Sequence, residues 1–420
     1  MKITLTQFRP NTAEAVWTDC FAQAIAELHK AGGGVLTVPT GEYSTGPIEL
    51  CSNMELHLEP GAVIRFLNDP AAFPLQECQY EGRISHRPKP CLSAFNAENV
   101  ALTGSGVLDG CGAPWWAAQR ARTLANGRPY LLHFENVTHL RVCGVQLRNS
   151  PAWTVHPLNC VDVLIEDVSI CNPYNSPNTD GINPESCRDV RILNCRVDVG
   201  DDCITLKSGT EETPSPVPCE NIVIANCLLV HGHGGIVIGS EMSGGVRNVT
   251  VTNCVFTGTD HGLRVKTRRR RGGCVENLRL SNLVMERVFC PFVFNMYYSC
   301  GTAEKDRWVW EKTPYPVDGG TPAFRNIRIN GVTVVGATAS AGFFYGLAES
   351  PIDGLSLTDC HIEMARGAAP EKPAMMGNLE PMSARGFFLR NAKNVEFHNV
   401  TLKNADGEAY DTDESVDGEF

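Results

Sequence analysis

The sequence predicts an all-β fold, a single right-handed parallel β-helix, because a short unit recurs, alternates like a strand and has no helix between copies. Each unit begins with Asn or Asp followed by a β-branched residue or Leu. The units begin at Asn136, Asp162, Asp189, Asn221, Asn248, Asn277, Asn326 and Asn394. The first spacings are 26, 27, 32, 27 and 29 residues, which suit one β-helix coil per unit. A leucine-rich repeat has a similar period, but its regular leucine frame is absent.

Within each unit, apolar and polar residues alternate, as in Val190–Leu193 and Val249–Val251. Such alternation with β-branched residues is typical of strands. Six residues after the anchor stands a residue of a type that is usually buried, at Val168, Cys195, Cys227, Cys254, Leu283, Val332 and Val400. We expect this column to line the interior and the anchoring Asn residues to form a hydrogen-bonded ladder at a turn.

The ends of such a stack need caps, because an open strand edge would pair with other chains. Apolar residues at helical spacing predict an N-terminal capping helix over about residues 13–31, ended by Gly32–Gly34. Residues 406–420 are acidic and are predicted to be a flexible tail. All of residues 1–420 are then one catalytic domain. Longer excursions at 66–98, 111–130, 300–323 and 364–391 are expected to line a groove.

Composition excludes several classes of protein. The 420 residues are 43% hydrophobic, too many for a disordered chain, and 36 basic against 47 acidic residues give a net charge of −11, which disfavours nucleic acid as a partner. No apolar run approaches the about 18–20 residues of a membrane span, and the first residues do not resemble a signal peptide. We therefore expect a cytoplasmic protein that binds no membrane.

The 18 cysteines form no CxxC pair and are expected to pack as free thiols.

Four short motifs with reactive side chains occur on four consecutive coils: Asn178-Thr179-Asp180, Gly200-Asp201-Asp202, Gly232-His233-Gly234 and Arg264-Val265-Lys266. Counted from the anchor of each coil, Asp180 is at +18, Asp201 and Asp202 at +12 and +13, and His233 at +12. Arg264 and Lys266 are at +16 and +18, and their separation by two residues places both on one side of a strand. Stacking is therefore expected to gather these side chains on one surface.

Clustered carboxylates, an imidazole and two cations suit the hydrolysis of a glycosidic bond in an anionic sugar chain. One carboxylic acid protonates the leaving oxygen and another carboxylate activates water. Carboxylates that are close together do not all ionise easily, so one can remain protonated as the acid. The cations suit a sugar that itself carries a carboxylate. A calcium site would need about six to eight oxygen ligands, and the adjacent cations disfavour it, so no metal or cofactor is predicted.

These motifs resemble those of glycoside hydrolase family 28, the polygalacturonases, which read NTD, GDD, GHG and R-I/V-K. Further stretches that are similar to the family are Thr103–Gly110, Trp115-Trp116 and Asn149–Trp153, and the resemblance spans about residues 14–404. Val265 stands where Ile is commoner, and both residues favour strands. The stretch Gly234–Gly245 is similar to the bacterial exo-acting branch.

The resemblance implies a single displacement with inversion. It implies that Asp201 is the general acid, that Asp180 and Asp202 hold and deprotonate the water, and that His233 supports protonation of the acid. The residues that it implies for binding the uronate are Asn178, Arg264 and Lys266. The spacing alone leaves open which of the two adjacent aspartates is the acid.

The expected substrate is a galacturonate-containing oligosaccharide, cleaved by release of α-1,4-linked galacturonate from a chain end. The aromatic insertion at 300–323 is expected to close the groove. Tyr297 and Tyr298 either stack on a sugar or pack in the core or at the surface. Arg268–Arg271 is either a solvated loop or a binder of further uronates. The alternatives are an exo-hydrolase of rhamnogalacturonan fragments, a calcium-dependent pectate lyase and a non-catalytic carbohydrate-binding β-helix.

Overall fold

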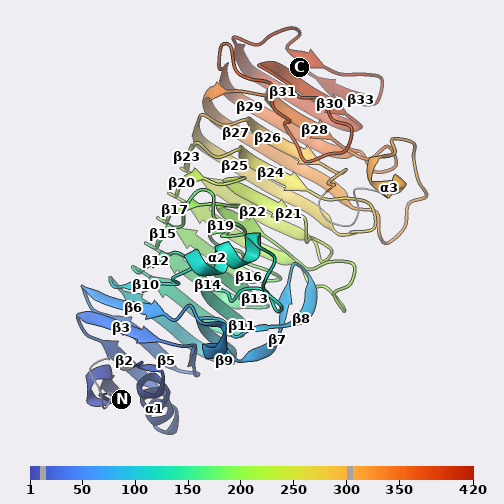
Figure 1. Cartoon of the computed structure of the whole chain (residues 1–420). Coiled ribbons are helices and arrows are strands. Elements are labelled where there is room, and N and C mark those ends of the chain that lie inside the picture. The colour runs from blue at the N-terminus through green and yellow to red at the C-terminus, as the bar shows by residue number, and fades with distance from the viewer. Residues whose placement is uncertain (10–15, 300–305) are drawn as a thin grey trace. The chain divides into compact units, whose positions relative to one another are not determined.

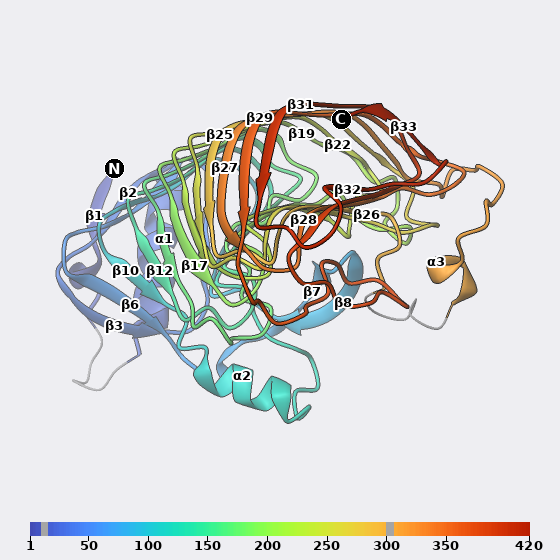
Figure 2. The same cartoon turned by 90° about the horizontal axis from the view of Figure 1, so that it is seen from above.

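A computed structural model describes residues 1–9, 16–299 and 306–420, which fall into two compact units, Met1–Asp201 and Asp202–Phe420. Figures 1 and 2 show that each unit is a stack of coils made of short, parallel strands. No helix of the described residues is long and apolar enough to cross a membrane.

In the first unit, parallel strands stack in three columns. One column contains β1 (Lys2–Thr4), β2 (Gly34–Val38), β5 (Met54–Leu58), β9 (Leu92–Gly104), β11 (Leu132–Cys143), β14 (Val161–Glu166) and β16 (Arg188–Leu193). A second contains β3 (Gly41–Thr45), β6 (Ala62–Phe66), β10 (Val107–Asp109), β12 (Gln146–Arg148), β15 (Ser169–Cys171) and β17 (Arg196–Val199). The third contains β4 (Ile48–Leu50), the first parts of β9 and β11, and β13 (Val155–Leu158).

The second unit repeats this plan. Its longest column contains β19 (Cys219–Ala225), β22 (Val246–Thr252), β25 (Cys274–Glu286), β27 (Ala323–Ala337), β29 (Ile352–Met364), β31 (Ala392–Lys403) and β33 (Val416–Glu419). Strands β20 (Leu228–His231) and β23 (Val255–Thr257) pair beside it, and β23 pairs with the end of β25. A separate sheet contains β18 (Ile204–Leu206), β21 (Ile236–Gly239), β24 (His261–Lys266), β26 (Cys290–Asn295), β28 (Ser340–Tyr345), β30 (Arg385–Arg390) and β32 (Tyr410–Asp411).

The core is a set of apolar columns that run along each stack. In the second unit, one column is in register over six coils, at Ile222, Val249, Leu278, Ile327, Leu355 and Val395. None of these side chains is more than 2% exposed. Burying one such side chain stabilises the fold by roughly 1.5–3 kcal/mol. The period of two along each strand therefore fixes which residues face the interior.

The predicted asparagine ladder is present on the turns of the second unit. The side-chain amides of Asn248, Asn277 and Asn326 each donate to the preceding Asn, beginning at Asn221, over 2.6–3.0 Å. All four have left-handed backbone angles, with φ between 54° and 59°. Asn tolerates this conformation better than most residues, and its amide both donates and accepts. These two properties explain why Asn recurs at the anchor.

The predicted interior column is confirmed for most of its members. Val168, Cys195, Cys227, Cys254, Leu283 and Val332 are all buried. Val400 is only half-buried, because β33 pairs with the Ala392–Glu396 part of β31 and stops short of it. The described cysteines are free thiols, and most are buried. Burial raises the pKa of the Cys290 thiol to about 12, so this side chain packs as an uncharged group.

The N-terminal cap is helix α1 (Thr18–Lys30), which packs against β2 and β4 at the start of the first unit (Figure 1). Its apolar face buries Phe21, Ala24 and Leu28. Part of the predicted range, residues 13–15, lies outside the described residues. At Gly34, where φ is +147°, a Cβ would stand 2.2 Å from the Met1 carbonyl oxygen, so the chain here requires glycine.

The acidic C-terminal segment differs from its prediction as a flexible tail. Residues 406–420 contain β32 and β33, which pair with β30 and β31. The ring of Tyr410 stacks on Phe387 at 5.6 Å, and Phe420 lies 4.8 Å from Tyr410 and 5.5 Å from Phe397. Composition suggested disorder because the segment is rich in acids, but two aromatic anchors add it to the stack.

The longer excursions from the coils contain a hairpin and helices. Strands β7 (Leu75–Tyr80) and β8 (Arg83–Pro88) form an antiparallel hairpin in the first unit, preceded by the 3-10 turn η2 (Pro70–Ala72). Helix α2 (Ala113–Arg120) occupies another excursion of that unit, and the turn η1 (Leu5–Gln7) follows β1. In the second unit, the short helix α3 (Arg307–Trp310) projects from the strands on a loop (Figure 2). Residues 300–305 of the predicted 300–323 insertion lie outside the described residues.

Candidate active site

The four motifs of reactive side chains lie on the coils as follows. In the first unit, Asn178-Thr179-Asp180 lies in the loop after β15, and Gly200-Asp201 follows β17. In the second unit, Asp202 precedes β18, Gly232-His233-Gly234 precedes β21, and Arg264 and Lys266 lie on β24. Strands β18, β21 and β24 are adjacent and in register, with Ile204 opposite Ile236 and Ile236 opposite Leu263. Stacking thus places these three motifs of the second unit on or next to adjacent strands, as their similar offsets predicted.

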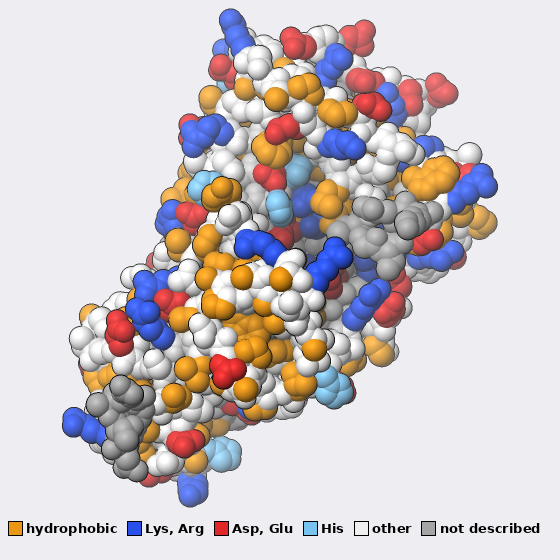
Figure 3. Space-filling view, in the orientation of Figure 1, with side chains coloured by type: hydrophobic (Ala, Val, Ile, Leu, Met, Phe, Trp, Pro, Cys, Tyr) orange, Lys and Arg blue, Asp and Glu red, His pale blue; other side chains and the backbone are white. Residues whose placement is uncertain are grey.

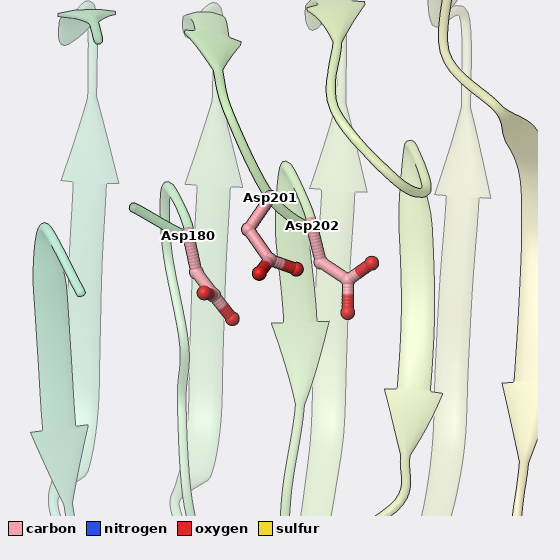
Figure 4. A group of neighbouring side chains, drawn as sticks. All are labelled: Asp180, Asp201 and Asp202. Atoms are coloured by element: carbon pink, nitrogen blue, oxygen red, sulfur yellow. The ribbon is translucent and has the colours of Figure 1, made fainter. Parts of the chain in front are cut away.

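Asp180 and Asp201 approach each other within the first unit. Each offers a carboxylate oxygen within 4.8 Å of one from the other (Figure 4). Asp180 is buried and accepts a hydrogen bond of 3.0 Å from Asn183 Nδ2. Asp201 is half-buried, and Asp202 follows it directly in the chain. The two acids of this unit therefore lie close enough to act on one bond.

Thr179, between Asn178 and Asp180, explains how the two loops are joined. Its hydroxyl oxygen accepts from the Gly200 backbone amide at 3.3 Å and shares a hydrogen bond of 2.5 Å with Ser176 Oγ. Thr179 is completely buried, so these contacts replace water. The central residue of the motif therefore connects the Asp180 loop to the Asp201 turn.

Asp202 is held by two cations within the second unit. Lys266 Nζ lies 2.8 Å from one carboxylate oxygen, and Arg264 lies 3.3 Å from the other. All three side chains are buried. Burial alone would raise the pKa of Asp202, but Lys266, Arg264 and the nearby Lys207 outweigh it and hold the pKa well below its usual value. Asp202 is therefore ionised at neutral pH.

His233 has a partner that sequence reasoning missed. Its Nδ1 lies 2.7 Å from Asp260 Oδ2, and its side chain is 55% exposed. Because a carboxylate next to Nδ1 favours a proton on that atom, Asp260 orients the imidazole. Asp260 is on the following coil, at an offset of +12 from Asn248, the same offset that His233 has on its own coil. That shared offset is the signal that could have identified it.

A second buried ion pair, Lys207 with Glu241, was also missed. Lys207 Nζ lies 2.7 Å from Glu241 Oε2. Burial alone would raise the pKa of Glu241, but Lys207, Arg271 and Lys266 lower it to about 2. Glu241 belongs to the Gly234–Gly245 stretch. This stretch therefore supplies a negative charge near the positive charges of Lys207 and Lys266. A lone Lys and a lone Glu that are 34 residues apart give no sequence signal.

The tyrosines after β26 pack internally. Tyr297 is fully buried, and Tyr298 is 7% exposed. The Tyr298 ring centroid lies 5.4 Å from Lys266 Nζ and 5.9 Å from the Arg264 guanidinium. Tyr297 faces Lys312, whose Nζ stands 3.2 Å from its ring centroid. Of the two predicted roles, packing against cations describes both rings.

Arg268–Arg271 is not a solvated loop, because three of the four side chains are buried. Arg268 and Arg271 both pair with Glu211, at 2.8 and 2.7 Å. Arg269 pairs with Glu349 and donates to three backbone carbonyls in residues 308–313. Arg270 is exposed over the Trp308 ring, and around α3 basic and hydrophobic side chains lie together at the surface (Figure 3). The run therefore anchors the aromatic loop.

The carboxylates closest to a metal-binding arrangement are those of the aspartate motifs. Asp180 and Asp201 alone offer too few oxygens for calcium, which takes about six to eight. Asp202 is already paired with Lys266 and Arg264. The side chains present thus favour acid–base chemistry over the binding of a hard cation.

Coils of parallel strands that carry adjacent acids, an imidazole and two cations have the side chains that acid–base cleavage of an anionic sugar chain requires. Residues 36–367 match the family described as Glycosyl hydrolases family 28, and the chain belongs to this family. It is therefore a glycosidase, as predicted.

Individual relatives of this chain are also named as polygalacturonases. A probable polygalacturonase of Vitis vinifera is 30% identical over 84% of this chain and 72% of its own. An exopolygalacturonase of Platanus acerifolia is 26% identical over 76% of this chain and 82% of its own. The crystal structure of an exopolygalacturonase from Thermotoga maritima matches with a TM-score of 0.77 at 29% identity, covering 96% of this chain and 92% of that one. The predicted right-handed parallel β-helix is thereby confirmed.

Proposed function

We propose that this protein is an exo-acting polygalacturonase that hydrolyses α-1,4-linked galacturonate from the end of a pectic oligosaccharide with inversion. Family membership supports the hydrolase class, and relatives named as exopolygalacturonases support both the substrate and the exo mode. The comparisons favour this function over rhamnogalacturonan hydrolysis, a lyase reaction and non-catalytic binding.

The single observation that carries the mechanism is the pairing of Asp202 with Lys266 and Arg264. A carboxylate held ionised by two cations is suited to hold and deprotonate water, and it is unsuited to donate a proton. The general acid is then its neighbour, Asp201. The electrostatics of the second unit thus supply a physical argument for an assignment that spacing left open.

The remaining roles follow from this division. Asp180 and Asp202 are the carboxylates assigned to hold and deprotonate the water, and Asp201 is assigned to the leaving oxygen. His233, oriented by Asp260, supports the protonated form of Asp201. Lys266 and Arg264, the cations that contact Asp202, are suited to bind a uronate carboxylate, and Asn178 is suited to donate to a uronate. An anionic substrate offers these groups charge-assisted hydrogen bonds.

A time course on a defined oligogalacturonide tests this function. Free galacturonate is expected from the first time point, together with a chain that is one unit shorter and has the inverted anomeric configuration. Early products of intermediate length would contradict the exo mode but not the hydrolase reaction. The same assay with EDTA separates hydrolase from lyase, because an unsaturated, ultraviolet-absorbing product that disappears on chelation and returns with calcium would overturn the hydrolase assignment.

A further inference from the structure

Arg128, in the loop before β11, is a buried cation, only 2% exposed, whose hydrogen bonds go to uncharged oxygens. The carboxylates of Glu81 and Asp180 act on it through their charge, but neither is among its hydrogen-bond acceptors in the described residues. A buried guanidinium is costly unless its N–H groups are satisfied. The acceptors that satisfy it therefore indicate what the residue does.

All three acceptors of Arg128 lie in the loops that surround Asp180. Its Nη1 donates to the carbonyl oxygens of Pro151 at 2.9 Å and Pro177 at 2.5 Å. Its Nη2 donates to the side-chain oxygen of Asn178 at 2.6 Å. The guanidinium thus joins the loop before β13 to the loop of the first aspartate motif.

The bond to Asn178 fixes the direction of that side-chain amide. A guanidinium has five donors and no acceptor, so Asn178 must present its oxygen to Arg128. Its Nδ2 group is consequently turned away from Arg128, as a donor. Asn178 is half-buried, has a left-handed backbone with φ of 52° and stands two residues before Asp180 in the same loop.

We propose that Arg128 is a positioning residue that fixes Asn178 as a hydrogen-bond donor to the substrate uronate. This inference rests on the proposed function. It assigns to Arg128 an indirect role, exerted through its hydrogen bond to Asn178. Without Arg128, the amide can rotate and present its oxygen to the uronate carboxylate, which repels it. The lost bond is charge-assisted, so about 10- to 100-fold in kcat/KM depends on it.

The variant Asn178→Asp separates this role from a purely structural one. The carboxylate has the size of the amide and gains an ion pair with Arg128, so thermal stability should be maintained or increased. Its second oxygen replaces the donor, so kcat/KM on digalacturonate should fall at least about 10-fold, mainly through KM. A stable N178D protein with wild-type kcat/KM would overturn the proposal.

A double-mutant cycle tests whether Arg128 acts through Asn178. R128M and N178A should each lower kcat/KM, and R128M/N178A should lose little more than either single variant. Additive losses would overturn the proposal. R128K, which retains one cationic donor, replaces R128M where the latter does not fold. R87M is the matched control, since Arg87 donates to the Arg128 carbonyl without contacting Asn178 and should show no coupling.

The two levels of inference fail differently. If the wild-type protein releases no galacturonate, the proposed function fails and this inference falls with it. If the wild-type protein is active and the losses are additive, only the role of Arg128 fails.

Discussion

Asp201 and Asp202 are adjacent in the chain, yet their surroundings differ. Asp202 is buried between Lys266 and Arg264, whereas Asp201 is half-buried and lies near Asp180. A sequence cannot distinguish two neighbouring aspartates, because both have the same offset to within one residue. Asp202 contacts Lys266 and Arg264 on β24, whereas Asp201 lies near Asp180 in the loop after β15, and this difference depends on the folded chain.

Removing the proton donor should abolish turnover without preventing binding. In Asp201→Asn, kcat should fall by several orders of magnitude and KM should change little, because a general acid acts mainly in the transition state. Steady-state kinetics on digalacturonate measure both constants. A folded D201N protein with near wild-type kcat would contradict the assignment.

Removing a cation from Asp202 should move the pH profile. Lys266 lowers the pKa of Asp202, so the base stays ionised far into acid; in Lys266→Met the carboxylate protonates at higher pH. The acidic limb of kcat/KM should therefore shift upward. The stability that the pair contributes is present above the ordinary pKa of Asp and is lost as pH falls through the depressed value. An unmoved acidic limb in K266M would exclude Asp202 as the titrating base.

How much of the site the sequence predicted depends on whether a residue belongs to a local pattern. Asp180, Asp201, Asp202 and His233 stand in short motifs at similar offsets, so they could be found. Residues such as Arg128 and Lys207 act through partners on other coils, and no local motif marks them. The burial of Arg269 was missed for the same reason, because a run of four arginines reads as solvated until Glu349 is placed beside it.

At the scale of the element, the strands were predictable because their period of two and the Asn anchors are local properties. The hairpin β7–β8 and the helix α2 were predicted only as excursions, because they interrupt the repeat. The Lys207–Glu241 pair shows a further limit. It connects residues that follow the ends of two adjacent strands, β18 and β21, and is defined only once those strands pair.

This pair should matter to stability. Glu241→Gln removes the carboxylate that Lys207 Nζ contacts at 2.7 Å, and breaking a buried pair in this way costs about 3–5 kcal/mol. Urea unfolding measures the loss. Glu220→Gln is the matched control, because its pair with Arg247 is partly exposed and contributes at most about 1 kcal/mol. The double variant E241Q/K207M should recover part of the loss; equal effects of E241Q and E220Q would argue against the buried pair.

At the scale of the whole molecule, the repeat predicted the fold class but not where the stack ends. The last repeat anchor is Asn394, and the following residues have the composition of a tail. The final strands β32 and β33 are short, and their placement depends on long-range contacts of Tyr410 and Phe420 that no repeat pattern contains. An end cap is a departure from the repeat, so periodicity cannot predict it.

Deleting residues 406–420 tests this assignment of the C-terminal end. The deletion removes four ring contacts, those of Tyr410 with Phe387, Phe397 and Phe420 and that of Phe420 with Phe397. Such pairs contribute about 0.5–1.5 kcal/mol each, so unfolding free energy should fall by at least about 2 kcal/mol. The deletion also exposes the edges of β30 and β31, which promotes association between chains. Urea unfolding and light scattering measure the two effects.

Asp417→Ala is the control, because it changes the same segment and removes no ring, so stability and monodispersity should both stay near wild type. A truncated protein that is as stable and as monodisperse as the full chain would show that this segment does not cap the stack.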